Sequence, residues 1–482
     1  MALTVETIHF IGGQGTKAGS SNSGGGCTKA AWEDAGKLNE DLDNVMDANG
    51  GSIASSFVNV TIRENTGYVE LYKEGGFSSD YDGLIVNIPA STGTLPDDRY
   101  IITSATADTL VLNIIWAAGH AGTCSAFVGG AFDTYQHAID NIDDASDYKN
   151  SRWVYSNKDV TLSSTLTMNL VGVYADNAHV YFIGYNLVPG DRDIGGTYFG
   201  TLTDIDADAG AYHLLTYGDA DENIHWNNFK FHNTASNEHA AYLAASGAAT
   251  YGFFFDNCEF DDILGVAIDA AAAYSSDITI HNCTFGTGNV EHIFLRYCGN
   301  AIIDRCIFKD GAVESPVNVG GGTFINNIVI GGERGLQQSY EDSLLLVLNN
   351  TFYLQTDGAI MVNRGGTVVE NNICYLTAAA DFGVGFHGFN EPNSIHIKNN
   401  CVWSAAGAVT NPYYDEEHSL VLPGSGSVFE DPDFVDAANL DFTPQNVNVL
   451  YGGKLDLNEY VGPMGAIKTT SRMTGGLGGT SI

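Results

Sequence analysis

The chain reads FFFDNCEF at residues 253–260, ITIHNCTF at 278–285 and AIIDRCIF at 301–308. In each stretch an apolar strand is followed by polar residues, usually asparagine, and then by alternating apolar residues. Further copies read IHWNNFKF (224–231), TFINNIVI (323–330), LVLNNTFY (346–353), VVENNICY (368–375) and HIKNNCVW (396–403). Self-similarity at a near-constant period indicates a repeat architecture, so this pattern predicts a solenoid.

The period indicates which repeat this is. The second polar residue of each copy serves as a marker: Asn228, Asn257, Asn282, Arg305, Asn327, Asn350, Asn372 and Asn400, at intervals of 29, 25, 23, 22, 23, 22 and 28 residues. A step of about 22 residues closes a coil of three short strands, each rising about 3.3 Å per residue. The spacing therefore predicts a parallel β-helix.

Each marker is expected at a tight bend, because asparagine tolerates the left-handed conformation and stacked asparagines can form a hydrogen-bonded ladder. The residues one and three places after the marker should then point inward. The first inward column would be Phe229, Cys258, Cys283, Cys306, Ile328, Thr351, Ile373 and Cys401, and the second Phe231, Phe260, Phe285, Phe308, Ile330, Tyr353, Tyr375 and Trp403. We expect the cysteines to pack as small hydrophobic residues.

In two copies the hydrophobic alternation does not fit the marker on both sides of the bend. Before the bend, the alternation around Asn372 and Asn400 is better if Asn371 and Asn399 are the bend residues, since Glu370 would otherwise point inward. After the bend, the original markers fit better. We expect a one-residue bulge that satisfies both halves.

The ladder of strand, asparagine and strand resembles the pectate-lyase-like right-handed parallel β-helix superfamily, and most of all the phage tailspike and virion β-helix proteins. The resemblance covers residues 131–468 and implies an all-β fold. It implies no single function, because the superfamily includes lyases, hydrolases, epimerases, adhesins and tailspikes. Analogy with phage β-helices implies a homotrimer.

The two ends predict further units. AFDTYQHAIDNIDDA (131–145) is typical of an amphipathic helix that caps the solenoid, with Phe132, Tyr135, Ala138 and Ile139 on one face. Residues 52–130 alternate like a small β domain. Residues 1–51 are interpreted as an arm and helix that dock on a neighbouring subunit, with disorder as the alternative, and residues 469–482 as a flexible glycine-rich tail.

Composition excludes several partners. The net charge of −38, from 58 acidic and 20 basic residues, disfavours nucleic acid and anionic membranes. The N-terminal MALTVETIHFIGG predicts no secretory signal, and no stretch approaches the roughly 20 apolar residues of a membrane-spanning helix. The eight cysteines form no CxxC pair, which disfavours zinc and redox sites. The acidity itself fits a solvated surface, calcium binding or a basic partner.

Two groups of residues are candidates for chemistry. Glu259, Asp261, Asp262, Glu291 and Arg296 are predicted to point outward about one coil apart and to share a face, as a lyase or a hydrolase requires. A solvated acidic face is the alternative. The motif DIDADAG (204–210) offers Asp204, Asp206 and Asp208 at the spacing of a Ca²⁺ loop, but Leu215 stands where that loop has its glutamate.

The sequence therefore supports three classes of function. The first is a structural protein of the virion surface, such as a phage spike, fibre or capsid decoration protein. It would contact other virion proteins through its arm and would bind host surface glycans. The second is a polysaccharide lyase or glycoside hydrolase, secreted or carried on a spike, acting on an acidic or surface polysaccharide. The third is a bacterial surface adhesin. We expect the first. The sequence favours a protein without enzymatic activity but leaves that question open, and an enzyme would be a polysaccharide lyase or a glycoside hydrolase.

Overall fold

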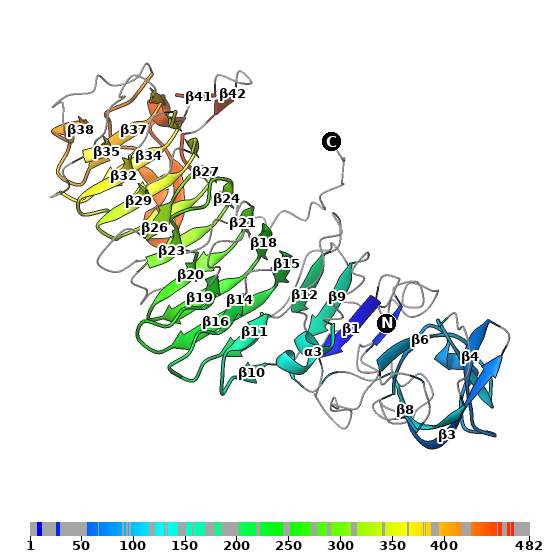
Figure 1. Ribbon diagram of the computed structural model, residues 1–482. Helices are drawn as coiled ribbons and strands as arrows, with labels where there is room; N and C mark the ends of the chain where they lie inside the picture. The colour runs from blue at the N-terminus through cyan, green and yellow to red at the C-terminus, as the bar shows by residue number, and fades with distance from the viewer. Residues whose placement is uncertain are drawn as a thin grey trace.

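The computed structural model describes residues 7–11, 26–28 and 55–466 of the chain, apart from internal gaps. The gaps are 66, 89–90, 93–94, 96–97, 115–120, 130–131, 133, 143–150, 157–158, 169–178, 185–201, 218–221, 244–250, 271–276, 287–290, 310–315, 340–342, 364–365, 379, 381, 387–394, 416–425, 451, 456–459 and 463. The described residues form a long parallel β-helix with a small barrel beside its N-terminal end (Figure 1).

Three sheets run along the solenoid. Sheet 1 has the order β2 (Gly26–Thr28), β1 (Thr7–Ile11), β9 (Arg152–Ser156), β12 (Val180–Gly184), β15 (Glu222–Asn227), β18 (Tyr251–Asp256), β21 (Ile278–His281), β24 (Ala301–Asp304), β27 (Gly322–Ile325), β30 (Leu345–Leu348), β33 (Val368–Glu370) and β36 (His396–Lys398). Its strands are parallel except for the β1–β2 pair. The predicted parallel β-helix is confirmed.

Sheets 2 and 3 complete each coil. Sheet 2 consists of β10 (Val160–Thr161), β13 (Thr203–Asp206), β16 (Phe229–Thr234), β19 (Glu259–Ile263), β22 (Thr284–Phe285), β25 (Ile307–Lys309), β28 (Ile328–Ile330), β31 (Thr351–Tyr353), β34 (Ile373–Leu376) and β37 (Cys401–Ser404). Sheet 3 consists of β11 (Leu166–Met168), β14 (Leu215–Tyr217), β17 (Ala241–Leu243), β20 (Val266–Asp269), β23 (Glu291–Leu295), β26 (Val317–Val319), β29 (Arg334–Gln338), β32 (Gly358–Val362), β35 (Phe382–Phe386) and β38 (Asn411–Asp415).

The predicted small β domain is a closed antiparallel barrel. Its strands are β3 (Ser55–Asn65), β4 (Tyr68–Tyr72), β5 (Ile85–Ile88), β6 (Asp98–Ala105), β7 (Thr109–Leu112) and β8 (Gly122–Val128), in the order β3-β4-β7-β6-β5-β8, with a short 3-10 helix η2 (Ser79–Tyr81). Trp153 and Tyr155 of β9 are buried in the barrel's own apolar core. The barrel therefore packs against the outer face of sheet 1 at its N-terminal end.

The capping helix is confirmed as α3 (Tyr135–Ile142). Phe132, Tyr135, Ala138 and Ile139 are all buried in the solenoid core. Strand β1, from the predicted docking arm, extends sheet 1 by pairing with β9 of the same chain. The helix predicted between residues 28 and 51 and the tail at 469–482 lie outside the described residues, and docking by the arm stays a prediction.

The bends between sheets 1 and 2 follow the prediction in the first coils only. Asn228, Asn257, Asn282 and Arg305 have φ between 52° and 66°, in the left-handed region. In the later coils the left-handed residues are Asn326, Asn349, Asn371 and Asn399, so assigning the bend to Asn327, Asn350, Asn372 and Asn400 was wrong. Those four side chains point inward and are buried, and they form a second ladder inside the solenoid.

Because of this one-residue shift, the side chains predicted to point inward point outward in every later strand of sheet 2. Val329, Phe352 and Val402 belong to the solenoid core, whereas the predicted inward residues Ile328, Thr351, Ile373 and Cys401 face outward. Ile330, Tyr353, Tyr375 and Trp403 also face outward, so the two predicted columns are wrong from Ile328 onward. The expected bulge is not needed, because a C-terminal segment covers the outward apolar side chains.

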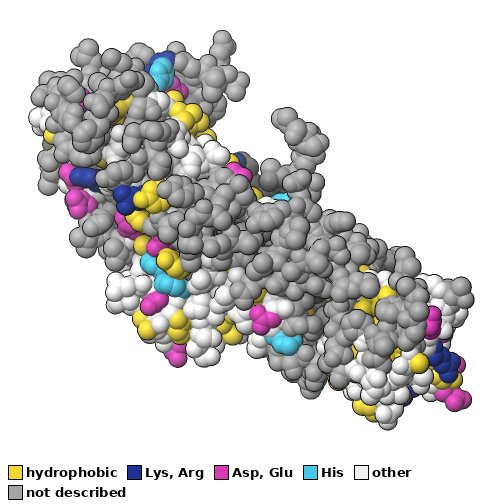
Figure 2. All heavy atoms as spheres, in the orientation of Figure 1, with side chains coloured by type: hydrophobic (Ala, Val, Ile, Leu, Met, Phe, Trp, Pro, Cys, Tyr) yellow, Lys and Arg dark blue, Asp and Glu magenta, His cyan; other side chains and the backbone are white. Residues whose placement is uncertain are grey.

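That segment, here called the C-terminal cover, comprises the described residues of 426–466. It contains β39 (Phe434–Asp436), a 3-10 helix η4 (Ala437–Asn439), β40 (Asp441–Pro444), α4 (Val447–Leu450), β41 (Gly453–Leu455) and β42 (Tyr460–Gly462). Within the described part of the chain, no helix is both long and apolar enough to cross a membrane. Figure 2 shows acidic and histidine side chains close together on one face of the solenoid, with only a few basic ones.

Candidate functional site

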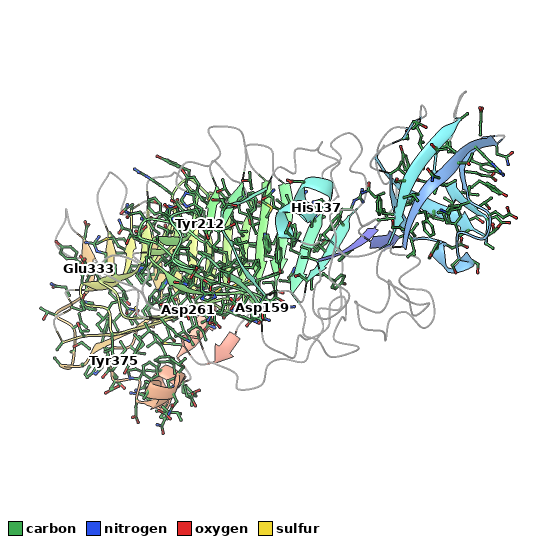
Figure 3. All side chains as sticks on the ribbon, turned by 90° about the horizontal axis from the view of Figure 1, so that it is seen from below. His137, Asp159, Tyr212, Asp261, Glu333 and Tyr375 are labelled. Carbon is green, nitrogen blue, oxygen red and sulfur yellow. The ribbon has the colours of Figure 1, made fainter. Side chains whose placement is uncertain are left out.

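The outer face of sheet 2 carries charged side chains over three adjacent strands. Alternation buries Thr203 and Ile205 of β13, so its two aspartates point outward. The strand register places Asp204 beside Lys230 and Lys230 beside Glu259, with His232 beside Asp261 in the next outward row. We call this surface the carboxylate face: Asp204, Asp206, Lys230, His232, Glu259 and Asp261. In Figure 3, Asp159 and Asp261 are labelled on the same side of the solenoid.

Lys230 is the centre of the face. Its Nζ lies 3.2 Å from Oε1 of Glu259 and 3.3 Å from Oδ2 of Asp261. Burial alone would lower the pKa of Lys230, but hydrogen bonds and charge from Glu259 and Asp261 together raise it above its usual value. The side chain is therefore charged at neutral pH. All three side chains remain about one-third exposed, so a ligand can reach them.

His232 joins the other two carboxylates. Its Nε2 lies 2.7 Å from Oδ1 of Asp204 and 4.0 Å from Oδ2 of Asp206. Burial raises the pKa of Asp204; the neighbouring His232 opposes this shift and the negative charge of Asp159 adds to it, with a net rise. The backbone N–H of Asp204 donates to Oδ1 of Asp159, at 2.9 Å, which keeps that second carboxylate at the edge of the face.

The structure brings together parts of the two groups predicted from sequence. Glu259 and Asp261, from the catalytic group, share the carboxylate face with Asp204 and Asp206, from the proposed calcium loop. Lys230 and His232, which link them, were missed. The signal was present in the repeat, since Lys230 and Glu259 both stand two places after a marker asparagine.

The rest of the predicted catalytic group lies elsewhere. Glu291 begins β23 of sheet 3, and Arg296 follows that strand with its guanidinium 5.4 Å from the centre of the Tyr297 ring. The expectation that they share a face with Asp261 and Asp262 was wrong. The reason is that the chain turns from sheet 2 to sheet 3 just after Asp262, which itself has φ 50°.

The predicted calcium residues lie partly in a strand. Asp204 and Asp206 belong to β13, and Asp208 follows in the turn with φ 50°. Oδ1 of Asp206 accepts hydrogen bonds from the Asp208 N–H, at 2.7 Å, and from Asn233 Nδ2, at 2.9 Å. Among the residues that the structure describes, no three His, Cys, Asp or Glu side chains are placed to hold a metal ion. The geometry gives a calcium site no support.

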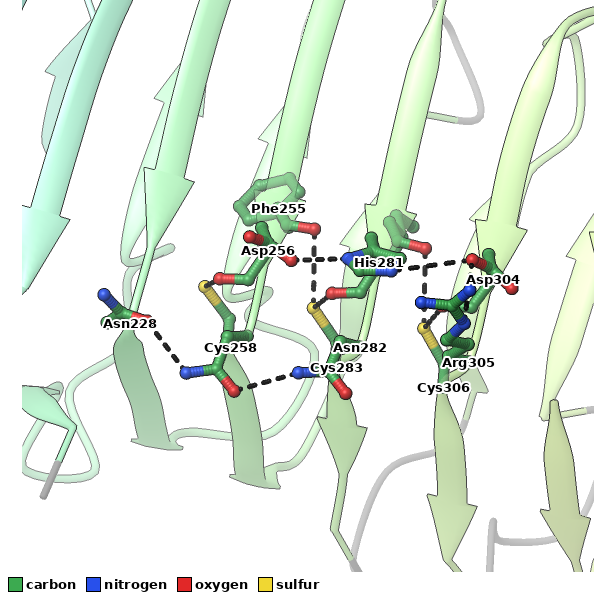
Figure 4. A network of polar contacts seen from close by, with 12 residues as sticks. Asn228, Phe255, Asp256, Cys258, His281, Asn282, Cys283, Asp304, Arg305 and Cys306 are labelled. Carbon is green, nitrogen blue, oxygen red and sulfur yellow. Dashed lines mark hydrogen bonds and ion pairs between the residues drawn. The ribbon is translucent and has the colours of Figure 1, made fainter. Parts of the chain in front are cut away.

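Three histidine clusters lie outside this face among the residues that the structure describes. On the outer side of sheet 1, Nδ1 of His179 lies 2.8 Å from Nε2 of His225. At the bend from sheet 1, His281 lies between Asp256, at 2.6 Å, and Asp304, at 3.5 Å (Figure 4). Next to sheet 3, the rings of His213 and His239 stack with centroids 4.8 Å apart. Sequence reasoning missed all three clusters, because each combines residues from different coils.

No family model and no curated protein matches the chain. It is similar to the catalytic unit of a thermostable GH87 α-1,3-glucanase from Streptomyces thermodiastaticus, with a TM-score of 0.27 and 10% identity over 78% of this chain and 97% of that chain. It is also similar to a GH87 α-1,3-glucanase catalytic domain in complex with tetrasaccharides, with a TM-score of 0.22 and 11% identity over 78% of this chain and 88% of that chain.

Likenesses this weak carry no argument about function. They give no support to the expected resemblance to phage tailspikes or to a virion role. The homotrimer, the contacts with virion proteins, the host glycan and the location on a particle are not tested by them and stay predictions.

Proposed function

We propose that this chain is a glycoside hydrolase that cleaves a neutral polysaccharide on the carboxylate face. The observation that supports it is the convergence of four carboxylates, a lysine and a histidine on one accessible surface of three adjacent strands. Most glycoside hydrolases use one protonated and one ionised carboxyl group on either side of the scissile bond. This face offers carboxyl groups in two different environments.

Asp204 is the proposed proton donor. Burial raises the pKa of its carboxyl group, an effect that Asp159 reinforces and His232 reduces, and a raised pKa is what a general acid needs near neutral pH. The Nε2 of His232 lies 2.7 Å from Oδ1 of this carboxyl group. Glu259 is the proposed base, because the positive charge of Lys230 lies between it and Asp204 in the register.

The spacing favours an inverting reaction. Asp204 and Glu259 are on strands two apart, which corresponds to ~10 Å between their Cα atoms. Inverting enzymes separate their carboxyl groups by about 6.5–9.5 Å to admit a water molecule, whereas retaining enzymes use about 5 Å. Asp204 would protonate the glycosidic oxygen as its bond to the anomeric carbon breaks. Water would attack that carbon and give its proton to Glu259.

The charge of the face favours a neutral substrate. Asp159, Asp204, Asp206, Glu259 and Asp261 surround a single lysine and a histidine. An acidic polysaccharide would be repelled by this surface and by the net charge of −38. The acidic substrate considered from sequence is therefore disfavoured.

The test is an activity screen of the purified full chain against neutral and acidic polysaccharides, with release of reducing ends as the readout. We expect activity on a neutral polymer, and proton NMR of the first product should show an inverted anomeric configuration. Glu259→Gln and Asp204→Asn should each lower kcat by at least about 100-fold, the usual contribution of a positioned acid or base.

The matched control is Asp277→Asn, which removes one negative charge from an exposed position before β21. It should leave activity unchanged. If no polysaccharide is cleaved, or if Glu259→Gln behaves like the control, the proposed function is wrong.

A further inference from the structure

The outer face of sheet 2 is open over its first strands and closed over its last ones. One outward row runs Lys230, Glu259, Thr284, Ile307, Ile328, Thr351, Ile373 and Cys401 in the strand register. The first four side chains are partly exposed, while Ile328 is 4% exposed and the last three are fully buried. The boundary therefore lies between β25 and β28.

Apolar contacts hold the C-terminal cover on the closed part. Ile328 clusters with Phe442 and Ala466, while Ile373 and Cys401 cluster with Val449 and Met464. In Figure 3, Tyr375 lies at the end of the molecule where this segment folds back. Burial of a large apolar side chain stabilises by about 1.5–3 kcal/mol, so several such contacts bind the cover firmly.

Buried hydrogen bonds also hold the cover. The N–H of Ala466 donates to Oγ1 of Thr351, at 3.1 Å, and the N–H of Gly465 donates to the carbonyl of Asn371, at 2.8 Å. Both join the last described residues of the chain to strands of the solenoid, across 115 positions in the case of Thr351. The cover is thus fixed to the solenoid by hydrogen bonds from its backbone as well as by apolar contacts.

We propose that the C-terminal cover is a fixed end-stop for a polysaccharide bound on the carboxylate face. This inference rests on the proposed function. A bound chain that follows the row from Asp204 to Glu259 continues over Thr284 and Ile307 and then meets the cover at β28. From β19 to β28 is three strand spacings, ~14 Å, which holds only a few sugar units. Cleavage beside Glu259 therefore releases short oligosaccharides of a narrow length range from that side.

The test shortens the open section by a substitution that leaves the residues of the cover and the carboxylates unchanged. Ile307→Trp places a bulky side chain on the outward row between Glu259 and the cover. Ile302→Trp is the matched control, because it lies in the same coil but points outward from sheet 1, where it is 46% exposed. Products from a neutral polysaccharide are separated by chain length, and the binding of an oligosaccharide length series is measured for each variant.

We expect the full chain to give a narrow set of short products. Ile307→Trp should shift the set to shorter products and weaken binding of the longer oligosaccharides by about tenfold, whereas Ile302→Trp should change neither. Cleavage with a broad range of lengths that Ile307→Trp leaves unchanged would overturn the end-stop and leave the proposed function standing. Absence of both binding and cleavage would overturn the proposed function and the end-stop with it.

Discussion

The first and last coils of the solenoid fill the same inward column of sheet 2 with different kinds of side chain. One inward column runs through both halves: Phe229, Cys258, Cys283, Cys306, Asn327, Asn350, Asn372 and Asn400. In the first half it holds Phe229 and then three small apolar thiols, and the outer face of sheet 2 is open and charged. In the second half it holds amides, and the outer face is apolar and covered.

The difference shows in the hydrogen bonds. Each thiol donates weakly to carbonyl groups, as Cys283 does to His281, at 3.3 Å (Figure 4). Each amide forms more hydrogen bonds than a thiol does. Nδ2 of Asn350 donates to the carbonyl of Phe324 and to Oδ1 of Asn372, and its own Oδ1 accepts from the backbone and side chain of Asn327. The amide column therefore ties each later coil to the next through side chains as well as backbone.

The two halves of the solenoid therefore differ in role. A fully satisfied buried amide network rigidifies the coils that contain it. Those coils carry the cover, while the coils with thiols leave their outer face free for the carboxylates. We infer that stability is concentrated where the surface is closed, and chemistry where it is open.

The largest expected effect breaks the amide column. Asn350→Leu keeps the branched shape of the side chain but leaves the N–H of Asn327 and the carbonyl of Phe324 without their buried partner. We expect a loss of roughly 2–5 kcal/mol, since each unsatisfied buried group costs about 1–3 kcal/mol. The measurement is urea unfolding followed by circular dichroism.

The control in the thiol column is Cys283→Ala. It removes one sulfur atom and only weak hydrogen bonds, so we expect a loss of about 1 kcal/mol. Equal losses for the two variants would contradict the distinction between the columns, because they would show that satisfying the amide network adds nothing to stability.

A smaller effect should follow from loosening the cover. Phe442 is fully buried, and its ring lies 5.0 Å from that of Tyr353 and 5.3 Å from that of Phe434. Phe442→Ala should cost ~3 kcal/mol locally by leaving a cavity. Hydrogen exchange should then rise in the cover and in β28 to β34, and remain unchanged in β13 to β19. Faster exchange in β13 to β19 as well would show that the two halves are not independent.

The sequence was sufficient to predict the solenoid but not the register of its second half. At Asn257 a single asparagine stands at the bend, so the choice is unambiguous. At Asn326 and Asn327 two adjacent asparagines both fit the bend. Ile328 then favours the wrong choice, because an apolar residue is expected to point into the solenoid. It points outward and is buried by Phe442 and Ala466, more than a hundred positions away.

The carboxylate face was half predictable for a related reason. Alternation indicated that Glu259 and Asp261 point outward. Their partner Lys230 lies in the preceding coil, and Asp204 one coil further back, in a segment outside the recognised repeats. Pairing across strands depends on the lengths of the intervening turns, which vary from coil to coil, and no local pattern shows it.

The smallest expected effect concerns the ion pairs at the bend of the open half. A hydrogen bond with Asp256 raises the pKa of His281; burial opposes the shift, and the charges of Asp256 and Asp304 add to it. A histidine whose pKa is raised in the folded state contributes stability that is fully present below the unfolded pKa of about 6.5. That contribution is lost as the pH rises through the folded-state value.

Wild type should therefore exceed His281→Gln in stability below about pH 6.5, by less than ~1 kcal/mol because solvent screens a pair this exposed. The difference should shrink at alkaline pH. Thermal unfolding of both proteins across this range measures it, and Asp256→Asn should abolish most of the pH dependence by removing the main partner. A difference that grows with pH would mean that His281 is bound as the neutral form, and that the open half of the solenoid gains nothing from its surface charges at the bend.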